Sequence, residues 1–372
     1  MEIVEAVTRK QVNDFIKLPF VLHKNHEKWV PPLISDEKLY FDKSKNPSFQ
    51  KNDAILCILY DEHKPIGRIM GIINHSYNNL RNEKNARFGY LECRNDAAEA
   101  AALMKKVEEW GMSKGMNKIV GPLGFSDQDP EGFIIEGFEY EPTMSTYYNF
   151  KYIPKILTNI GYEKEIDYVV YLVDLRQPFT EVHKRIFNRI VDRDEIKFLE
   201  FNSKKELKPF VKQIIYVMNE SFKELYGFEP MCEDEINFLV KRFLPVINPK
   251  FIKAASVNGS LVGFLLAIPN LNEGFIKCNG RLLPFGILHL IRAADKTKQL
   301  DLLAAGVKKE FRGQGFETWG LMSVIKSAKE AGMKILDSHH ELENNNGVRK
   351  VMEHFNGKLA KRFRVYSKTL SN

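Results

Sequence analysis

The sequence lacks the marks of exported, membrane-spanning and metal-binding proteins. Its first ten residues contain no apolar core of a signal peptide, and its longest apolar stretches, such as residues 282–291, fall well short of the ~20 residues that a membrane-spanning helix needs. No CxxC pair occurs among its four cysteines, so neither a disulfide framework nor a metal site is indicated. We therefore expect a soluble cytoplasmic protein with no metal and no membrane partner.

A clustered basic stripe, which nucleic-acid binding usually requires, is also missing. The formal charge of +7 is spread along all 372 residues, so we expect no nucleic-acid partner. The net positive charge is the only feature that supports a nucleic-acid-binding protein. The same charge suits a polyanionic cofactor. Apolar residues make up 44% of the chain and aromatic residues 12%, which is enough to fill the cores of two domains.

The most informative stretch is residues 300–331. A short apolar run ends at Val307, Arg312-Gly313-Gln314-Gly315 follows, and an amphipathic helix begins there. The free N–H groups and positive dipole end of a helix N-terminus attract an anion, and glycine lets the backbone approach it closely. The pattern indicates a phosphate site. The alternative is a glycine loop that opens a helix for steric reasons only.

The two halves of the chain repeat one order of elements. The second half predicts a strand (196–201), two helices (206–227 and 233–246), a hairpin around Asn258-Gly259, an insertion, and the strand, loop and helix just described. A strand through KILDSHHEL, a helix at 345–355 and a closing strand follow. The first half repeats this order up to its own closing strand. We expect an α/β fold with mixed sheets and domains at 1–175 and 176–372.

The loop resembles the coenzyme A loop of the GNAT superfamily of acyl-CoA-dependent N-acyltransferases, in which Arg/Gln-x-x-Gly-x-Gly/Ala opens a helix after a strand ending in valine. Glu317 departs from the pattern, and its carboxylate in the first turn favours the helix dipole instead. The wider likeness to tandem GNAT proteins is carried by several short segments: 29–33, 67–69, 121–122, 125–126, 135–138 and 364–366.

The resemblance implies two GNAT-like domains in tandem, each a mixed, mostly antiparallel twisted sheet flanked by helices. It also implies acetyl-CoA or another acyl-CoA as co-substrate. The residues that it assigns to cofactor binding are Ala305, Gly306, Val307, Arg312, Gly313, Gln314, Gly315, Phe316 and Asn345.

The first half has no such loop. Asp96 stands near the start of the corresponding helix, where it serves as an N-cap and fills the anion site with its own charge. We therefore expect the first half to have lost the cofactor and to shape the acceptor site. Acidic residues between Asp127 and Glu141 suit a cationic amine, and the alternative is a solvated loop.

The usual catalytic tyrosine of the superfamily falls at Met352, which cannot donate a proton. Replacement candidates are His339, His340 and Tyr366. Adjacent strand residues point to opposite faces, so only one histidine is expected to face a given cleft, and the pair cannot jointly hold a metal. A structural or surface role is the alternative for each histidine.

The resemblance implies acyl transfer, most simply acetyl transfer, from CoA to the amine of a small molecule or peptide. The rival hypothesis is a non-catalytic CoA-binding or protein-interaction module, which Met352 and Glu317 support.

Overall fold

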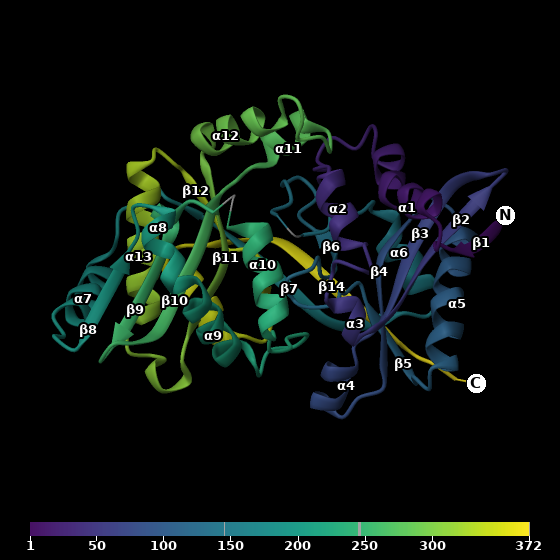
Figure 1. The fold of residues 1–372 in the computed structure, drawn as a ribbon. Helices are drawn as coiled ribbons and strands as arrows, with labels where there is room; N and C mark the ends of the chain where they lie inside the picture. The colour runs from purple at the N-terminus through teal and green to yellow at the C-terminus, as the bar shows by residue number, and fades with distance from the viewer. Residues whose placement is uncertain (145, 245–246, 372) are drawn as a thin grey trace. The chain divides into compact units, whose positions relative to one another are not determined.

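The structure, a computed structural model, describes residues 1–144, 146–244 and 247–371 (Figure 1). By its internal contacts the chain divides into two compact units. Unit 1 comprises residues 1–168, 272–292 and 361–372, and unit 2 comprises residues 169–271 and 293–360. No helix in the described ranges is both long and apolar enough to cross a bilayer.

Unit 1 is a mixed sheet covered by helices on both faces. Its strands run in the order β1-β2-β3-β4-β5-β14, and β6 pairs with β14. Adjacent strands are antiparallel except β4 and β5, which are parallel. The elements are β1 (Glu2–Glu5), α1 (Arg9–Leu22), α2 (Ile34–Tyr40), α3 (Ser48–Lys51), β2 (Asp53–Asp61), β3 (Lys64–Ile73), α4 (His75–Arg81), β4 (Asn85–Cys93), α5 (Ala97–Ser113), β5 (Lys118–Gly121), β6 (Phe133–Glu136), α6 (Tyr152–Asn159) and α11 (Asn272–Cys278).

The two faces of β3 bury different side chains because successive residues of a strand alternate. Ile69 and Ile73 pack in the core beneath α5, and Met70 and Ile72 pack in the core beneath α1. A Cβ on Gly71 would lie 2.9 Å from Val107 in α5, so glycine is what lets this helix lie close to the strand. Burial on both faces explains why β3 reads as an almost continuous apolar run.

Unit 2 repeats this plan with strand order β8-β9-β10-β11-β12-β7, in which only β11 and β12 are parallel. β13 pairs with β7. The elements are α7 (Glu181–Val191), β8 (Ile196–Glu200), α8 (Lys204–Leu207), η1 (Lys208–Phe210), α9 (Val211–Phe222), α10 (Glu233–Phe243), η2 (Pro249–Phe251), β9 (Ile252–Val257), β10 (Ser260–Pro269), β11 (Gln299–Val307), η3 (Lys309–Phe311), α13 (Phe316–Glu330), β12 (Ile335–Asp337), β13 (Glu341–Leu342) and α14 (Asn346–His354).

The sheet of unit 2 also separates two cores. Leu265, Leu300 and Leu302 pack with the apolar face of α13, including Val324. On the other face, Phe264 packs with Met218 and its neighbours from α9. The strand that enters the glycine loop is therefore held between helices on both sides.

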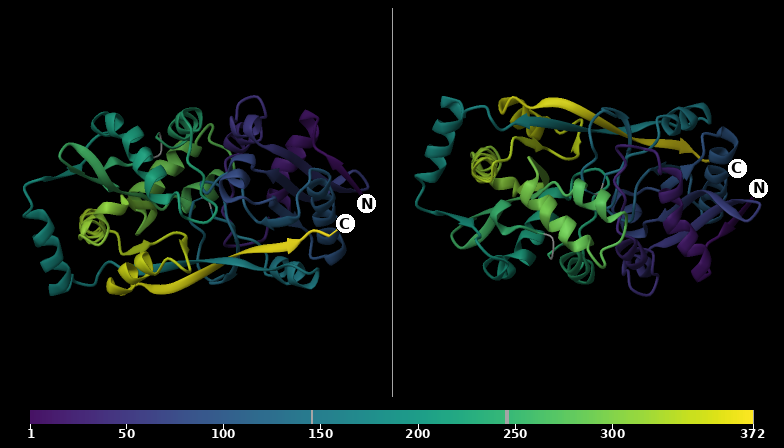
Figure 2. Two further views of the ribbon diagram at one scale, coloured as in Figure 1. Left: turned by 90° about the horizontal axis from the view of Figure 1, so that it is seen from below. Right: turned by 90° about the horizontal axis from the view of Figure 1, so that it is seen from above.

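Three elements pass from one unit into the other: β7 (Glu163–Asp174), α12 (Gly286–Lys296) and β14 (Lys358–Thr369). β14 is a single extended strand, yellow in both views of Figure 2. Its residues 366–369 pair with β5 of unit 1, whereas residues 172–174 of β7 pair with β12 of unit 2. The domain boundary expected after residue 175 stays a prediction.

Short sequence patterns predicted most helices and strands correctly. Asn258 and Gly259 have φ of 50° and 81° and turn the β9–β10 hairpin as expected. The single helix predicted over 206–227 is wrong, since Pro209 lies at the start of the short helix η1, between α8 and α9, and α9 ends at Phe222. The helix predicted over 233–246 is observed to Phe243, and residues 245–246 lie outside the described part of the chain.

Candidate functional site

The glycine loop of unit 2 lies directly before the N-terminus of α13, as the sequence predicts. Gly313 and Gly315 have φ of 72° and 100°, where a residue with a side chain is strained. Gly315 is the N-cap of α13 and, having no side chain, leaves the first turn without a side-chain cap. A Cβ on Gly315 would lie 3.2 Å from Ile186, whereas no described atom lies within 4 Å of a Cβ on Gly313. The loop is therefore packed at Gly315 and open at Gly313.

Arg312 and Gln314 hold the shape of this loop. The Arg312 guanidinium donates from Nε to the Val307 carbonyl at 3.1 Å and from Nη2 to the Ser221 carbonyl at 2.7 Å. The Gln314 amide donates to the Glu310 carbonyl at 2.9 Å. Both side chains thus brace the loop, and contact of either with a phosphate stays a prediction.

Glu317 reaches back toward the loop. The Gly313 N–H, which precedes the helix, donates to its carboxylate at 3.4 Å, and the negative charge in the first turn of α13 favours the helix dipole. A phosphate in the loop would therefore have to displace this carboxylate. Phe316, predicted to touch the cofactor, is buried in the core beside Phe311, so only its backbone can do so.

β11 and β12 separate just before the loop. Their parallel pairing ends at Asp301 and Asp337, yet β11 continues to Val307. Ala305 and Gly306 pair with β10 on the other edge, and the register shifts by one residue beside Leu266. Among the described residues no strand pairs with this part of β11 on its β12 side. The splay predicted for residues 305–307 is therefore present, and alternate backbone groups there face the gap.

The chain that follows β12 stays on β7 and does not continue along β11. If β12 continued its parallel pairing beyond Asp337, residues 338–341 would lie beside β11. Instead, this segment leaves the edge of β11 and ends in β13, which pairs with β7. The Ser338 N–H donates to the Tyr171 carbonyl of β7 at 2.9 Å, so among the described residues no strand takes the place of β12 beside residues 302–307 of β11.

His339 and His340 both lie in this departing segment. His339 has a φ of 58°, so the strand predicted through KILDSHHEL is broken after Asp337. The two rings lie edge to face with centroids 5.0 Å apart, and the His340 N–H donates to His339 Nδ1 at 2.6 Å. The expectation that they point to opposite faces is therefore wrong, because alternation requires regular strand geometry. Within the described ranges no group of three His, Cys, Asp or Glu residues could hold a metal.

The structure does not bring the third catalytic candidate into unit 2. Tyr366 belongs to unit 1, where it is buried in the core and paired with Gly121 in β5. Burial raises the pKa of Tyr366 to about 12. Asn345, predicted to bind the cofactor, is the N-cap of α14 and accepts the Val348 N–H at 3.4 Å.

Met352 occupies the position at which the superfamily pattern has its catalytic tyrosine, and its side chain is only 3% exposed. It packs in the core of unit 2 with residues such as Tyr171, Val324 and Phe355. The position is therefore structural in this chain and does not offer a proton donor to the gap.

Met352→Tyr should accordingly destabilise unit 2 by about 1–3 kcal/mol through overpacking, and Met352→Ala by about 2–5 kcal/mol through the cavity it leaves. Denaturant unfolding would measure both values. Val348→Ala, at an exposed position of the same helix, is the control and should change stability by about 0.5 kcal/mol or less. A fully stable Met352→Tyr protein would contradict this account.

Glu341, which sequence reasoning did not select, is an unusual ionisable group in β13, the short strand that follows β12 and pairs with β7. Its side chain is 7% exposed, and neither carboxylate oxygen has a hydrogen-bond partner among the described residues. Burial raises its pKa to about 8, and Ser338 and Arg349 oppose this shift. A carboxyl group that exchanges its proton near neutral pH is suited to general base chemistry.

Arg349 and Tyr171 form the polar wall near Glu341. The Arg349 guanidinium donates to the Tyr171 hydroxyl at 3.0 Å and to the Glu343 carbonyl at 2.8 Å. The backbone N–H of Tyr171 donates to the Ser338 hydroxyl at 2.9 Å. These bonds fix α14 and β7 to the segment that carries Glu341.

The corresponding helix of unit 1 is already capped by carboxylates. Asp96 is the N-cap of α5 and accepts the Ala98 N–H at 2.7 Å, as predicted. The fully buried Glu99 carboxylate accepts the Arg94 backbone N–H at 3.2 Å and forms an ion pair with the Arg94 guanidinium. An anionic ligand at this helix end would meet the Asp96 carboxylate and N–H groups that already have partners, while the charge of Glu99 is balanced by Arg94.

The acidic segment of unit 1 is not a solvated loop along its whole length. Asp129 is buried and accepts hydrogen bonds from the Tyr40 hydroxyl at 2.7 Å and the Phe125 N–H at 2.8 Å. Burial raises the pKa of Asp127 to about 7 and that of Glu131 to about 8. The solvated-loop alternative is therefore wrong for these residues, although Glu136, Glu139 and Glu141 are exposed.

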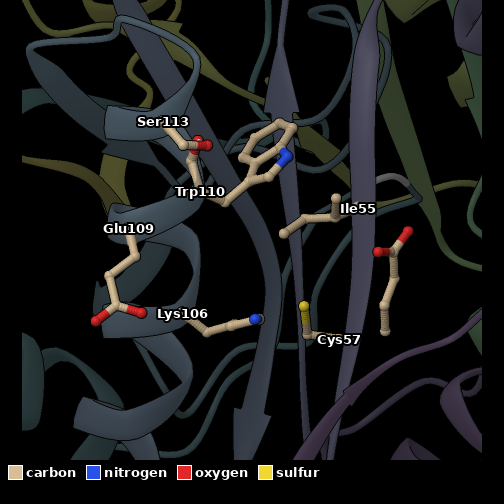
Figure 3. A pocket seen from close by; sticks show the side chains of 7 residues that line it. Ile55, Cys57, Lys106, Glu109, Trp110 and Ser113 are labelled. Atoms are coloured by element: carbon tan, nitrogen blue, oxygen red, sulfur yellow. The ribbon is translucent and has the colours of Figure 1, made fainter.

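A separate cavity of about 290 Å³ lies in unit 1 between α5 and the β1–β2 pair (Figure 3). The Lys106 side chain extends toward Cys57 in the close view, and Trp110 closes one side. Burial raises the pKa of the Cys57 thiol to about 12, despite the opposing charge of Lys106. The thiol is therefore protonated at neutral pH, which agrees with a structural role for this buried cysteine.

The chain has a tandem GNAT fold, as the sequence predicted. A solved tandem GNAT protein from the clavulanic acid biosynthesis pathway matches with a TM-score of 0.56 and 11% identity, covering 100% of this chain and 99% of that one. No family model matches the chain.

Two curated relatives extend over nearly the whole length. A bacterial ceramide synthase from Caulobacter vibrioides is 24% identical over 381 residues, covering 100% of this chain and 98% of its own. Protein YghO from Escherichia coli is 24% identical over 377 residues, covering 98% of this chain and 94% of its own.

Proposed function

We propose that the protein is an acyl-CoA-dependent N-acyltransferase whose reaction takes place in unit 2. The observation that carries this proposal is the gap between β11 and β12, which opens after Asp301 and leads to the glycine loop at the start of α13. An extended pantetheine arm would lie along the free edge of β11, with the pyrophosphate at the loop. The thioester end and the pyrophosphate of the co-substrate would then both meet backbone N–H groups.

Glu341 is the base in this proposal. The acceptor amine attacks the thioester carbonyl carbon, and the Glu341 carboxylate takes the proton that the nitrogen loses as the C–N bond forms. Backbone N–H groups on the free edge of β11 stabilise the negative carbonyl oxygen. The C–S bond then breaks, and the thiolate takes a proton from Glu341, whose pKa of about 8 lies close to that of a thiol.

The acceptor class that we favour is a long-chain amine. The curated relative from Caulobacter vibrioides is named a ceramide synthase, and a ceramide is the amide of a fatty acid with a long-chain amino alcohol. The similarity extends over both whole chains, so the two proteins share their overall plan. Acetyl groups and longer acyl groups are both donors to be tested.

A non-catalytic CoA-binding module is the second candidate function. Two observations favour it, namely the structural role of Met352 and the Glu317 carboxylate beside the loop. The presence of Glu341 is what favours the enzyme, because a ligand-binding module has no need of an unpartnered buried acid.

The deciding experiment is release of free CoA from acetyl-CoA and a long-chain acyl-CoA, with a panel of amines that includes long-chain amino alcohols, short polyamines and amino acids. Product masses would identify the amide. We expect acceptor-dependent release with at least one donor. Tight CoA binding without any acceptor-dependent release would overturn the enzyme in favour of the binding module.

A further inference from the structure

Residues 283–291 form an exposed apolar surface in unit 1, here called the apolar ridge. Its exposed side chains are Leu283 (76%), Phe285 (65%), Ile287 (48%), Leu288 (49%) and Ile291 (53%). The sequence led us to expect no membrane partner, because this stretch is too short to cross a bilayer. Its exposure, which only the tertiary structure shows, changes that expectation.

The ridge points away from the protein. Gly286 and Ala293 are the buried positions of α12, and the helical period places Ile287 and Ile291 on the opposite side. A surface helix normally has polar residues on its solvent-facing side, whereas α12 has apolar residues there.

The base of the ridge is firmly attached to unit 1. The Ile34 N–H donates to the Gly280 carbonyl at 3.0 Å, and a Cβ on Gly280 would lie 2.7 Å from the Phe20 ring. The Cys278 thiol donates to the Gly286 carbonyl at 3.1 Å. The apolar side chains are therefore presented on a packed support rather than on a loose loop.

Positive charge flanks the ridge. Arg281 and Arg292 are exposed and lie at its two ends, and neither guanidinium forms an ion pair with any residue that the structure describes. Lys277 is paired with Glu273 on α11 and contributes no net charge. An apolar strip between two cationic ends matches the acyl chains and the anionic headgroups of a phospholipid monolayer.

We propose that the apolar ridge docks unit 1 on the surface of an anionic phospholipid membrane, with Leu283, Phe285 and Ile287 entering the headgroup boundary and the two arginines contacting phosphate. A contiguous exposed apolar patch of this kind marks an interaction site. The charge at both ends selects an anionic bilayer over an uncharged apolar partner. The proposal does not depend on the proposed function, since docking is a property of unit 1.

Vesicle co-sedimentation of the full-length protein tests this. We expect binding to vesicles of equal parts phosphatidylglycerol and phosphatidylcholine, weaker binding at high salt, and little binding to phosphatidylcholine alone. The variant Leu283→Ser/Phe285→Ser/Ile287→Ser should lower partitioning by at least about tenfold, because three apolar side chains no longer enter the bilayer. Arg281→Gln/Arg292→Gln should remove the preference for anionic vesicles.

The matched control is Leu80→Ser/Val182→Ser/Leu359→Ser, which changes three exposed apolar side chains outside the ridge. It should bind vesicles like the unchanged protein. Circular dichroism and thermal unfolding establish that each variant is folded, as expected for exposed positions. Equal binding by the ridge variant, or equal binding to neutral vesicles, would overturn the proposal. The proposal would also be overturned if the ridge holds a dimer together and the protein does not bind vesicles. Light scattering would then show a dimer for the unchanged protein and a monomer for the ridge variant.

Discussion

Glu341→Gln should lower acceptor-dependent CoA release by ~10²- to 10⁴-fold, the usual contribution of one acid–base residue. Glutamine keeps the size of the side chain but cannot accept the proton of the attacking amine. Glu343→Gln, two residues further along the chain, is the matched control and should leave the rate nearly unchanged. Steady-state release of free thiol, with CoA binding measured separately, checks the prediction.

The pH dependence of the same reaction should identify the base. With the pKa of Glu341 raised to about 8, kcat/KM is expected to rise as this carboxyl loses its proton through about pH 8. The acceptor amine titrates as well, but its titration is the same for the unchanged protein and for Glu341→Gln. The ratio of their kcat/KM values, plotted against pH, should therefore show the titration of Glu341 alone. A pH-independent ratio would show that Glu341 is not the base.

Stability provides a readout that does not need substrate. Since the pKa of Glu341 is higher in the folded than in the unfolded protein, the folded state holds an additional proton between about pH 4.5 and pH 8. The contribution of Glu341 to the free energy of unfolding thus falls as pH rises through that window. Glu341→Gln should remove this fall, so its stability relative to the unchanged protein should be greater at pH 8 than at pH 5.

Gly313→Asp should abolish the stabilisation of the protein by CoA. Aspartate tolerates the left-handed conformation better than most residues, and space for a side chain exists at Gly313. Its carboxylate would repel the pyrophosphate, so we expect affinity to fall by about 100-fold or more. At a CoA concentration of 100 times the original Kd, stabilisation should drop from about 2.7 to about 0.4 kcal/mol.

The control for this variant lies at the other end of the same helix. Gly332 has a φ of 73°, against 72° for Gly313, so Gly332→Asp meets the same backbone strain without touching the loop. CoA should stabilise this control normally. If both variants retain full stabilisation, CoA does not bind at the glycine loop, whereas loss in both would indicate a general defect of α13.

The features set by local chemistry were predicted from the sequence. Asn258-Gly259 demands a tight hairpin, Asp96 caps a helix, and the glycines at 313 and 315 precede α13. Each depends on neighbours within a few residues, so a residue pattern is sufficient to locate it. The repeat of such signals in two halves predicted the tandem fold.

Features that depend on distant neighbours were not predicted. His339 and His340 share one side because the strand breaks at a left-handed residue, which no local pattern marks. In the sequence, Glu341 is recognisable only as a residue of an apparent strand next to Leu342, and this pattern does not indicate that its side chain is buried. Its burial arises because β13 leaves the edge of β11 and pairs with β7 instead.

The sequence by itself thus determined the order of the elements, the two-fold repeat and the position of the glycine loop before α13, because hydrogen bonding and dihedral preference act over short distances. The tertiary structure decided which side chains are buried without partners and which are left exposed. Packing placed Met352 in a core and gave Glu341 its raised pKa, and it turned the apolar side of α12 outward. Burial is a property of the whole chain, so these features require the assembled fold.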